Sequence, residues 1–281
     1  MPDPHVPADL AGRIVVITGA SSGIGAAAAR QFTAAGATVV PIGRSVTRTA
    51  AIAAELGVEP LTADFARLDD VRRVADALLR RCPRIDVLAN NAGALFPRRE
   101  VTVDGHETSL QVNHLAPFLL TTLLLPRLRD SAARVVTTSS LGNRFGRLRM
   151  DDLEWERRRY GGGWIAYSTT KLMNVLFTRE LVRRTGIWAA CFNPGGVATN
   201  FAAGTRPARL LELGGLRRRL SISAADGARP LVWLAGAPDV TGYHGTYFDR
   251  FHPNAKVNPQ ADDPALAKLL WDRSADLTAM P

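Results

Sequence analysis

Short apolar runs alternate along the chain with longer segments in which apolar residues recur every three or four positions. The runs have the continuous, often β-branched character of buried strands, and they occupy residues 13–18, 37–42, 58–61, 85–89, 134–138, 187–192 and 245–248. The helical spacing covers residues 24–35, 47–56, 68–81, 107–128, 165–184, 224–234 and 264–275. Strands that alternate with helices in this way form a parallel sheet covered on both faces. We therefore expect an α/β fold with a doubly wound, mostly parallel sheet (a Rossmann fold) in a single domain over residues 1–281, with its ligand crevice at the carboxyl ends of the strands.

The strongly basic charge does not change this picture. The net charge is +9, but 32 of the 35 basic residues are arginines (35 less Lys171, Lys256 and Lys268), scattered along the whole chain. This distribution is typical of a solvated arginine-rich surface, so we expect no nucleic-acid partner. The longest apolar stretch, 115–126, is 12 residues long, whereas a membrane span needs about 20. With no secretory signal at the start and only two cysteines, the sequence favours a cytoplasmic protein without a membrane partner.

A glycine-rich turn follows the first expected strand and opens the first expected helix. It reads Thr18-Gly19-Ala20-Ser21-Ser22-Gly23-Ile24-Gly25. Glycines allow a tight turn and a close backbone approach, and a helix N-terminus offers free N–H groups to phosphate. The sequence therefore predicts a dinucleotide site here.

A tyrosine and a lysine lie four residues apart on the helix expected at 165–184. Tyr167 and Lys171 share one helix face. A lysine charge near a phenol lowers the phenol pKa, which makes tyrosine a usable general acid or base. We therefore expect Tyr167 to be the proton donor of an enzyme, with a pKa lowered by Lys171.

Other polar groups come at the ends of strands or beside this helix. The strand at 134–138 leads into two serines, Ser139 and Ser140. In the helix expected at 107–128, Pro117 has no N–H, so the carbonyl of Asn113 loses its usual donor and is free to hold a water. Next to it, His114 is expected to be a packed residue of the helix rather than a catalytic one.

These segments together resemble the short-chain dehydrogenase/reductase family, from residue 12 to about residue 277. The motif TGxxxGxG, the NNAG segment at 90–93, the YxxxK pair and the PGxVxT segment at 194–199 carry the resemblance. Four further features are similar to the retinol-dehydrogenase-like branch: VNHLAPFLLT at 112–121, the 27-position gap between Ser140 and Tyr167, KLMNVLF at 171–177, and GTYF at 245–248 with a late Leu-Trp pair. Two features depart from that branch: we expect no N-terminal membrane anchor, and Asn193 stands where histidine is common.

The resemblance implies a catalytic tetrad of Asn113, Ser140, Tyr167 and Lys171. Ser140 would hydrogen-bond the substrate carbonyl, with Ser139 as the alternative at that position. Lys171 would also hold the nicotinamide ribose, and Asn113 would hold a water that links Lys171 to solvent. Together, the residue patterns and the resemblance give the expected cofactor contacts: Gly19, Ser21, Ser22, Gly23, Ile24, Gly25, Arg44, Ser45, Asp64, Phe65, Asn91, Ala92, Gly93, Tyr167, Lys171, Pro194, Gly195, Val197 and Thr199.

The end of the second strand indicates which nicotinamide cofactor is preferred. An NAD-selective site places an acidic residue there, on the 2′-hydroxyl of the ribose. This strand instead leads into Arg44 and Ser45, and the first acidic residue downstream is Glu55. An arginine offers a planar set of donors to a 2′-phosphate. A competing acid, Asp64, follows the third strand, but in the family this position lies at the adenine ring. Because of Arg44 and the missing acid after the second strand, we expect the cofactor to be NADP(H).

The expected function is reduction of a ketone or aldehyde, or oxidation of the matching alcohol, by hydride transfer on a largely apolar small molecule. Two alternatives stay open at this point: reduction of a C=C bond, as in the similar protochlorophyllide reductases, and a catalytically silent NADP(H)-binding regulatory protein. We further expect an insertion at 141–164 and a substrate lid at 200–223, although an ordinary surface helix would also explain the leucines of 200–223. A homodimer through helices beside the active site is a further expectation, and no metal site is expected.

Overall fold

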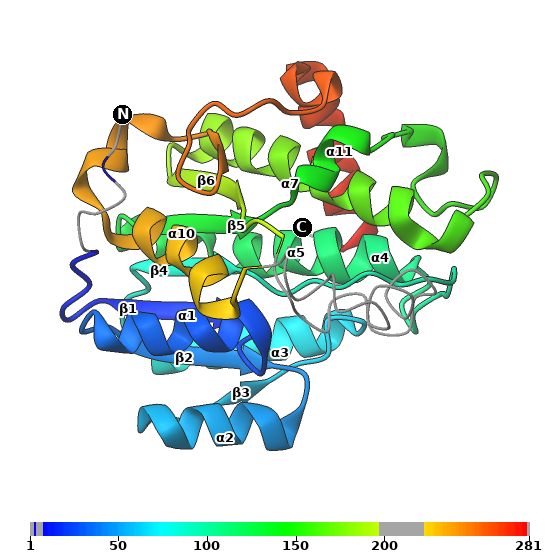
Figure 1. The fold of residues 1–281 in the computed structure, drawn as a ribbon. Helices are drawn as coiled ribbons and strands as arrows, with labels where there is room; N and C mark the ends of the chain where they lie inside the picture. Colours follow the sequence, from blue (N-terminus) through cyan, green and yellow to red (C-terminus); the bar gives the residue numbers. More distant parts are fainter. Residues whose placement is uncertain (1–2, 4–7, 197–221, 280–281) are drawn as a thin grey trace.

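The computed structural model describes residues 3, 8–196 and 222–279. In this part of the chain, seven strands form a parallel sheet in the order β3-β2-β1-β4-β5-β6-β7 (Figure 1). The strands are β1 (Ile14–Thr18), β2 (Thr38–Gly43), β3 (Leu61–Thr62), β4 (Val87–Asn90), β5 (Arg134–Thr138), β6 (Trp188–Asn193) and β7 (Tyr247–Asp249). The order reverses between β1 and β4, so the sheet is doubly wound and the predicted fold class is confirmed.

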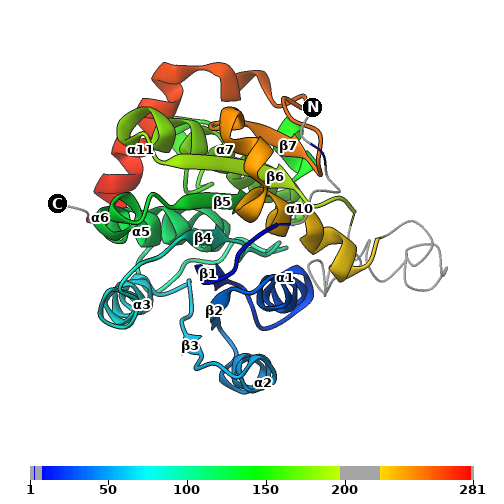
Figure 2. The ribbon, with the colours of Figure 1, turned by 90° about the vertical axis from the view of Figure 1, so that its left-hand side faces the viewer.

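Helices cover both faces of the sheet (Figure 2). One face carries α1 (Gly23–Ala34), α2 (Val46–Leu56) and α10 (Ala224–Gly236). The other carries α3 (Leu68–Arg81), α5 (Ala116–Leu123), α6 (Leu125–Asp130), α7 (Trp164–Thr185) and α11 (Pro264–Leu277). A short helix, α4 (Thr108–Leu110), and a π-helix, η1 (Gln111–Leu115), lead into α5. Short 3₁₀ turns are η2 (Leu141–Phe145), η3 (Met150–Asp152), η4 (Gly161–Gly163), η6 (Pro238–Tyr243) and η7 (Pro259–Asp262).

The period of two along each strand divides the core between the two faces. In β1, Val15 and Ile17 pack in the core beneath α1 and α10, whereas Val16 packs in the core beneath α3, α5 and α7. All three side chains are fully buried. The continuous apolar runs of the sequence are therefore strands that bury side chains on both faces.

The C-terminal helix α11 packs against the outer side of α5 and α7. The Trp271 ring stacks on Phe177 of α7 with centroids 5.8 Å apart, and it meets Phe118 of α5 edge-on at 5.0 Å. The expected homodimer through helices beside the active site stays a prediction. In the described residues, no helix is both long and apolar enough to cross a membrane.

Three expected elements need correction. The strand expected at 58–61 begins only at Leu61, because Gly57 (φ +67°) and Val58 close the end of α2 with backbone bonds to Ala54 and Ala53. The strand expected at 245–248 begins at Tyr247, after a turn at Gly245 (φ +74°).

The helix expected at 107–128 is not continuous. Its first turns are α4 and the π-helix η1, and a second break separates α5 from α6 at Leu124. Proline explains both breaks, since Pro117 and Pro126 have no N–H to complete the helical hydrogen bonds of the preceding turns.

Candidate active site

The glycine-rich turn after β1 makes a cradle that side chains would fill. Gly19 has φ +71°, and a Cβ built on it would lie 2.9 Å from Cα of Ala92. A Cβ on Gly25 would lie 2.2 Å from the carbonyl oxygen of Gly19, so neither position accepts another residue. The N-cap residue of α1, Ser22, makes no capping hydrogen bond through its side chain. Within the described residues, the N-terminus of α1 therefore keeps N–H groups for a phosphate, and the cradle fits a dinucleotide.

Three strand ends are joined beneath this cradle. The hydroxyl of Thr18, the last residue of β1, accepts hydrogen bonds from the N–H groups of Asn91 and Ala92, both 3.0 Å long. The Asn91 amide donates to the carbonyl of Thr18 (3.0 Å) and accepts from the hydroxyl of Thr138 at the end of β5 (3.3 Å). Asn91, expected to contact the cofactor, thus uses its side chain to hold β1, β4 and β5 together.

The adenosine end of the expected site lies beyond β2 and β3. Arg44 directly follows β2 and is exposed, and Ser45 is the N-cap of α2. The backbone N–H of Asp64 donates to the carboxylate of Asp70 (2.9 Å), which fixes the turn after β3. The ring of Phe65 is buried in the core under α3, so its side chain does not line the crevice.

The two serines after β5 have different surroundings. Ser139 is buried, and its hydroxyl donates to the backbone carbonyl of Lys171 (2.8 Å). Ser140 is half-buried, and its hydroxyl accepts from the N–H of Gly142 (3.1 Å) and hydrogen-bonds Tyr167. The structure therefore gives Ser139 an anchoring role toward α7 and brings Ser140 to the phenol.

Tyr167 and Lys171 lie on one face of α7, as the spacing predicts, and both are buried. The Lys171 Nζ lies 5.5 Å from the centroid of the Tyr167 ring and donates to the carbonyl of Thr138 (2.9 Å). Burial lowers the pKa of Lys171 to about 8. Burial also raises the pKa of Tyr167 well above its ordinary value, while the hydrogen bond from Ser140 acts in the opposite direction. The expectation that Lys171 lowers the pKa of Tyr167 is thus wrong for this structure, because desolvation of the phenol outweighs the other influences.

Asn113 lies in the π-helix η1 and is completely buried. Its amide accepts from the N–H of Ala94 and donates to the carbonyl of the same residue, both at 2.9 Å. It also donates to the hydroxyl of Thr170 on α7 (3.3 Å). A Cβ on Gly93 would lie 3.1 Å from the Asn113 Oδ1 and 3.2 Å from the Lys171 Nζ. Asn113, Gly93 and Lys171 therefore meet where the loop after β4 crosses α7.

Two residues outside the expected site hold its parts in place. The first is Thr18, whose hydroxyl holds the loop after β4 as described above. The second is Asn193 at the end of β6, which accepts from the N–H of Leu141 (3.2 Å) and donates to the carboxylate of Asp249 at the end of β7 (2.8 Å). It thereby fixes the backbone that follows Ser140. The sequence signal for both residues is their place as the last residue of a strand.

The expected contacts after β6 are only partly described. Gly195 has φ +94°, and a Cβ on it would lie 3.0 Å from Cδ1 of Ile222. Pro194 precedes it at the carboxyl edge of the sheet. Val197, Thr199 and residues 200–221 of the expected lid lie outside the described residues.

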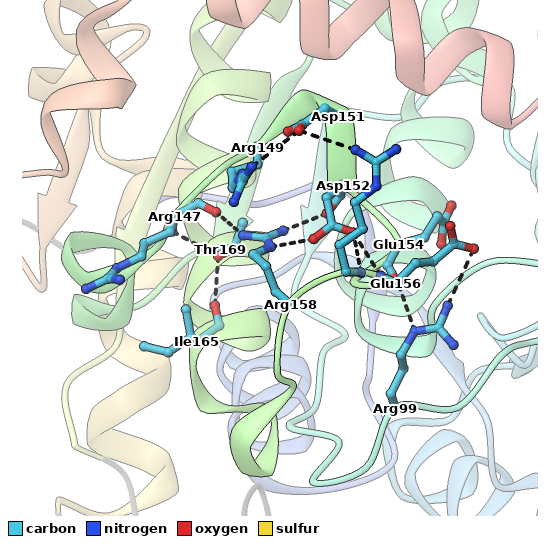
Figure 3. A network of polar contacts seen from close by, with 11 residues as sticks. Arg99, Arg147, Arg149, Asp151, Asp152, Glu154, Glu156, Arg158, Ile165 and Thr169 are labelled. Atoms are coloured by element: carbon cyan, nitrogen blue, oxygen red, sulfur yellow. Dashed lines mark hydrogen bonds and ion pairs between the residues drawn. The ribbon is translucent and has the colours of Figure 1, made fainter.

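The insertion at 141–164, which joins Ser140 to α7, is organised around one buried ion pair (Figure 3). Arg158 Nε donates to the Asp152 carboxylate (2.7 Å), and the other guanidinium nitrogens donate to the carbonyls of Arg147 (2.7 Å) and Asp152 (2.6 Å). The guanidinium lies 3.8 Å above the Trp155 ring. Although burial raises the pKa of Asp152, hydrogen bonds from Arg158 and from backbone N–H groups outweigh it and lower that pKa. A hydrogen-bonded ion pair within the insertion thus holds its backbone together.

The same insertion is tied to the helices on either side. The N–H of Arg147 donates to the Thr169 hydroxyl on α7 (3.0 Å), as Figure 3 shows. The Tyr160 hydroxyl donates to the Glu107 carboxylate (2.8 Å), which caps α4. The insertion therefore bridges α4 and α7, the helices that lead to Asn113 and Tyr167.

Comparison with known proteins gives matches over nearly the whole chain. Residues 13–151 match the family model for short chain dehydrogenase. A Streptomyces sp. (strain C5) protein assigned as a daunorubicin C-13 ketoreductase is 42% identical over 273 residues, which cover 95% of this chain and 92% of that protein. Human retinol dehydrogenase 12 is 37% identical over 282 residues, covering 95% of this chain and 87% of that one.

Solved structures with the same fold include two with clear sequence similarity. An uncharacterised protein from Mycobacterium paratuberculosis is 35% identical with a TM-score of 0.79, and the match covers 99% of this chain and 98% of that one. A protein from Beutenbergia cavernae, described as an NAD(P)-dependent gluconate 5-dehydrogenase with bound NADP, is 28% identical with a TM-score of 0.70. That match covers 86% of this chain and 96% of the other.

Proposed function

Because the chain belongs to the short-chain dehydrogenase family, in its retinol-dehydrogenase-like branch, we propose that it is an NADP(H)-dependent oxidoreductase that interconverts a ketone or aldehyde and an alcohol on a largely apolar small molecule. One observation carries the proposal. Ser140, Tyr167 and Lys171 converge at the carboxyl edge of the sheet, beside a glycine cradle that fits a dinucleotide. The relatives' names, a ketoreductase and retinol dehydrogenases, cover both directions of such a reaction.

In this mechanism the reacting carbonyl oxygen lies between two hydroxyl groups. The Ser140 hydroxyl donates to that oxygen and polarises the carbonyl, which stabilises the negative charge that develops there. The Tyr167 hydroxyl transfers its proton to the same oxygen as the alcohol forms. The raised pKa of Tyr167 keeps the phenol protonated before the reaction, as a proton donor requires.

Lys171 stabilises the phenolate that proton transfer leaves behind. With a pKa of about 8, its ammonium carries a positive charge at neutral pH, next to the Tyr167 ring. Asn113 holds the loop after β4 against α7 and so fixes the buried surroundings of this charge. The cofactor, when bound, supplies the hydride; Gly19, Gly25 and the N-terminus of α1 would hold its phosphates.

The preference for NADP(H) rests on the residue that follows β2. Arg44 is exposed at the end of β2, and the residues from there into α2 carry no carboxylate before Glu55. A bidentate contact between an arginine and a 2′-phosphate is worth about ten- to a hundredfold in affinity. An acid at this position would instead repel the phosphate.

The test compares NADPH and NADH at equal concentration with a panel of ketones and aldehydes. We expect NADPH-dependent carbonyl reduction in the wild type, and alcohol rather than a saturated carbonyl as the product. Arg44→Ala should lower the affinity for NADPH about ten- to a hundredfold and leave the affinity for NADH unchanged. Equal use of NADH by the wild type would disprove the cofactor preference, and failure to reduce any carbonyl would disprove the reaction. A cytoplasmic location stays a prediction.

A further inference from the structure

The segment that joins Ser140 to Tyr167 carries several exposed apolar side chains. In the described residues, seven large apolar side chains are exposed, and three of them belong to the 141–164 insertion: Leu141, Phe145 and Trp164. Leu141 directly follows Ser140, and Trp164 is one helical turn before Tyr167. Exposed apolar side chains next to catalytic residues are candidates for contacts with an apolar substrate.

Trp164 differs from the other aromatic residues of the insertion. Trp155 is buried under the Arg158 guanidinium, and its ring meets Tyr160 edge-on at 5.9 Å. The Tyr160 hydroxyl donates a hydrogen bond to the Glu107 carboxylate and so already has a partner within the protein. Trp164, by contrast, leaves 47% of its surface exposed, and its indole N–H makes no hydrogen bond within the described residues.

The indole lies next to the group that delivers the proton. The rings of Trp164 and Tyr167 have centroids 5.8 Å apart with an interplanar angle of 33°. On α7 these residues are at positions i and i+3, so their side chains lie on one face. The exposed part of the indole is therefore within reach of the groups that flank a carbonyl held by the Tyr167 hydroxyl.

The backbone before Trp164 holds the indole in this place. Gly163, the N-cap of α7, has φ +79°, and a Cβ on it would lie 1.9 Å from the carbonyl oxygen of Phe96. The loop after β4 thus presses directly on the start of α7. This contact fixes the first turn of the helix and with it the backbone of Trp164, while the Tyr167 ring lies against its side chain.

We propose that Trp164 is a specificity-determining residue of this site, and that its indole face selects substrates whose carbonyl is conjugated to a planar group, such as aryl ketones. This inference rests on the proposed function. Stacking of a planar group on an aromatic ring contributes beyond the apolar area that it buries, and a puckered saturated ring of equal size lacks that contribution. The substrate class is therefore an apolar molecule that is flat next to the reacting carbon.

The test uses two ketones of the same skeleton, acetophenone and cyclohexyl methyl ketone, which differ in the planarity of the ring beside the carbonyl. The measured quantity is the ratio of their kcat/KM values with NADPH. We expect Trp164→Leu, which keeps apolar bulk without a ring, to lower the aryl-to-cyclohexyl ratio about three- to tenfold. Trp164→Phe should retain most of the ratio. Leu269→Ala, which truncates an exposed leucine of α11, should leave it unchanged.

The outcomes separate this inference from the proposed function. An unchanged ratio in Trp164→Leu would overturn the inference, and so would an equal loss on both ketones, because that would show Trp164 acting only through the packing of Tyr167. A wild type that reduces neither these ketones nor any other carbonyl would overturn the proposed function instead, and the inference with it.

Discussion

The catalytic groups and the insertion that joins them are neighbours, but different forces hold them. Ser140, Tyr167 and Lys171 are placed by β5 and α7, whose buried apolar residues fix the sheet and the helix against each other. The 141–164 insertion has short 3₁₀ turns, and the Asp152–Arg158 ion pair at its centre orders it. The positions of the catalytic side chains thus depend on the apolar packing between the sheet and α7. The neighbouring insertion depends on a local polar network, which can change without altering the sheet.

The largest effect should come from removing the proton donor. Tyr167→Phe keeps the buried ring and removes only the hydroxyl, so we expect turnover to fall about 10²- to 10⁴-fold. NADPH affinity should stay within a few-fold, because the fold around the cradle is untouched. Single-turnover kinetics and NADPH fluorescence titration measure the two quantities. Near-normal turnover would show that another group delivers the proton.

The insertion should unfold locally when its ion pair is broken. Asp152→Ala leaves the Arg158 guanidinium without its carboxylate, which costs about 3 kcal/mol for a buried pair. We expect faster hydrogen exchange in residues 147–160 and unchanged exchange in β1, β4 and β5. Turnover should fall less than in Tyr167→Phe.

Asp151 provides the matched control for this prediction. Its carboxylate side chain is 56% exposed and pairs with Arg149 and Arg157 at the surface. Asp151→Ala should change stability by less than about 0.5 kcal/mol, because exposed ion pairs contribute little. If both variants loosened the strands of the sheet equally, the two regions would not be held independently.

Lys171 should leave a pH signature in the stability of the catalytic region. Its pKa is about 8 in the folded protein and 10.5 ordinarily, so between these values the unfolded chain binds the additional proton. Lys171 should therefore contribute about 3 kcal/mol of added stability as pH rises from 8 to 10.5, on top of the pH dependence of all other groups. Lys171→Met lacks this gain, so its stability relative to the wild type should be highest near pH 7.

Chemical denaturation at pH 7, 8.5 and 10 measures this difference. Lys268→Met is the control, since Lys268 is exposed on α11 and pairs with Asp272. A Lys171→Met curve parallel to that of the wild type at all three pH values would mean that the buried amine keeps its ordinary pKa.

The sequence predicted most of the sheet because buried parallel strands and amphipathic helices have strong periodic patterns. The bounds of α3 and β5 are those expected, and the other main elements agree within a few residues. The errors lie where local chemistry overrides the pattern. Glycine turns shortened two strands, and prolines divided the helix expected at 107–128.

The site could be predicted only as far as motifs reach. Spacing placed Tyr167 and Lys171 on one face, but it gave no signal of how far burial shifts their pKa values. The side-chain roles of Asn91 and Asn193 depend on strands that are distant in sequence and adjacent in space. The Asp152–Arg158 pair was hidden among many arginines, since composition does not reveal which one is buried.

Because of the π-helix η1, the number of residues between α4 and α5 determines where Asn113 lies in the site. A π-turn is equivalent to an α-helix that has gained one residue, and each residue turns an α-helix by about 100°. Deleting a single residue within Gln111–Leu115 would let α4 continue directly into α5 with regular geometry. The packing of α5 would survive, but Asn113 would rotate away from Ala94. In this segment, a one-residue deletion would therefore be a more damaging change than most substitutions.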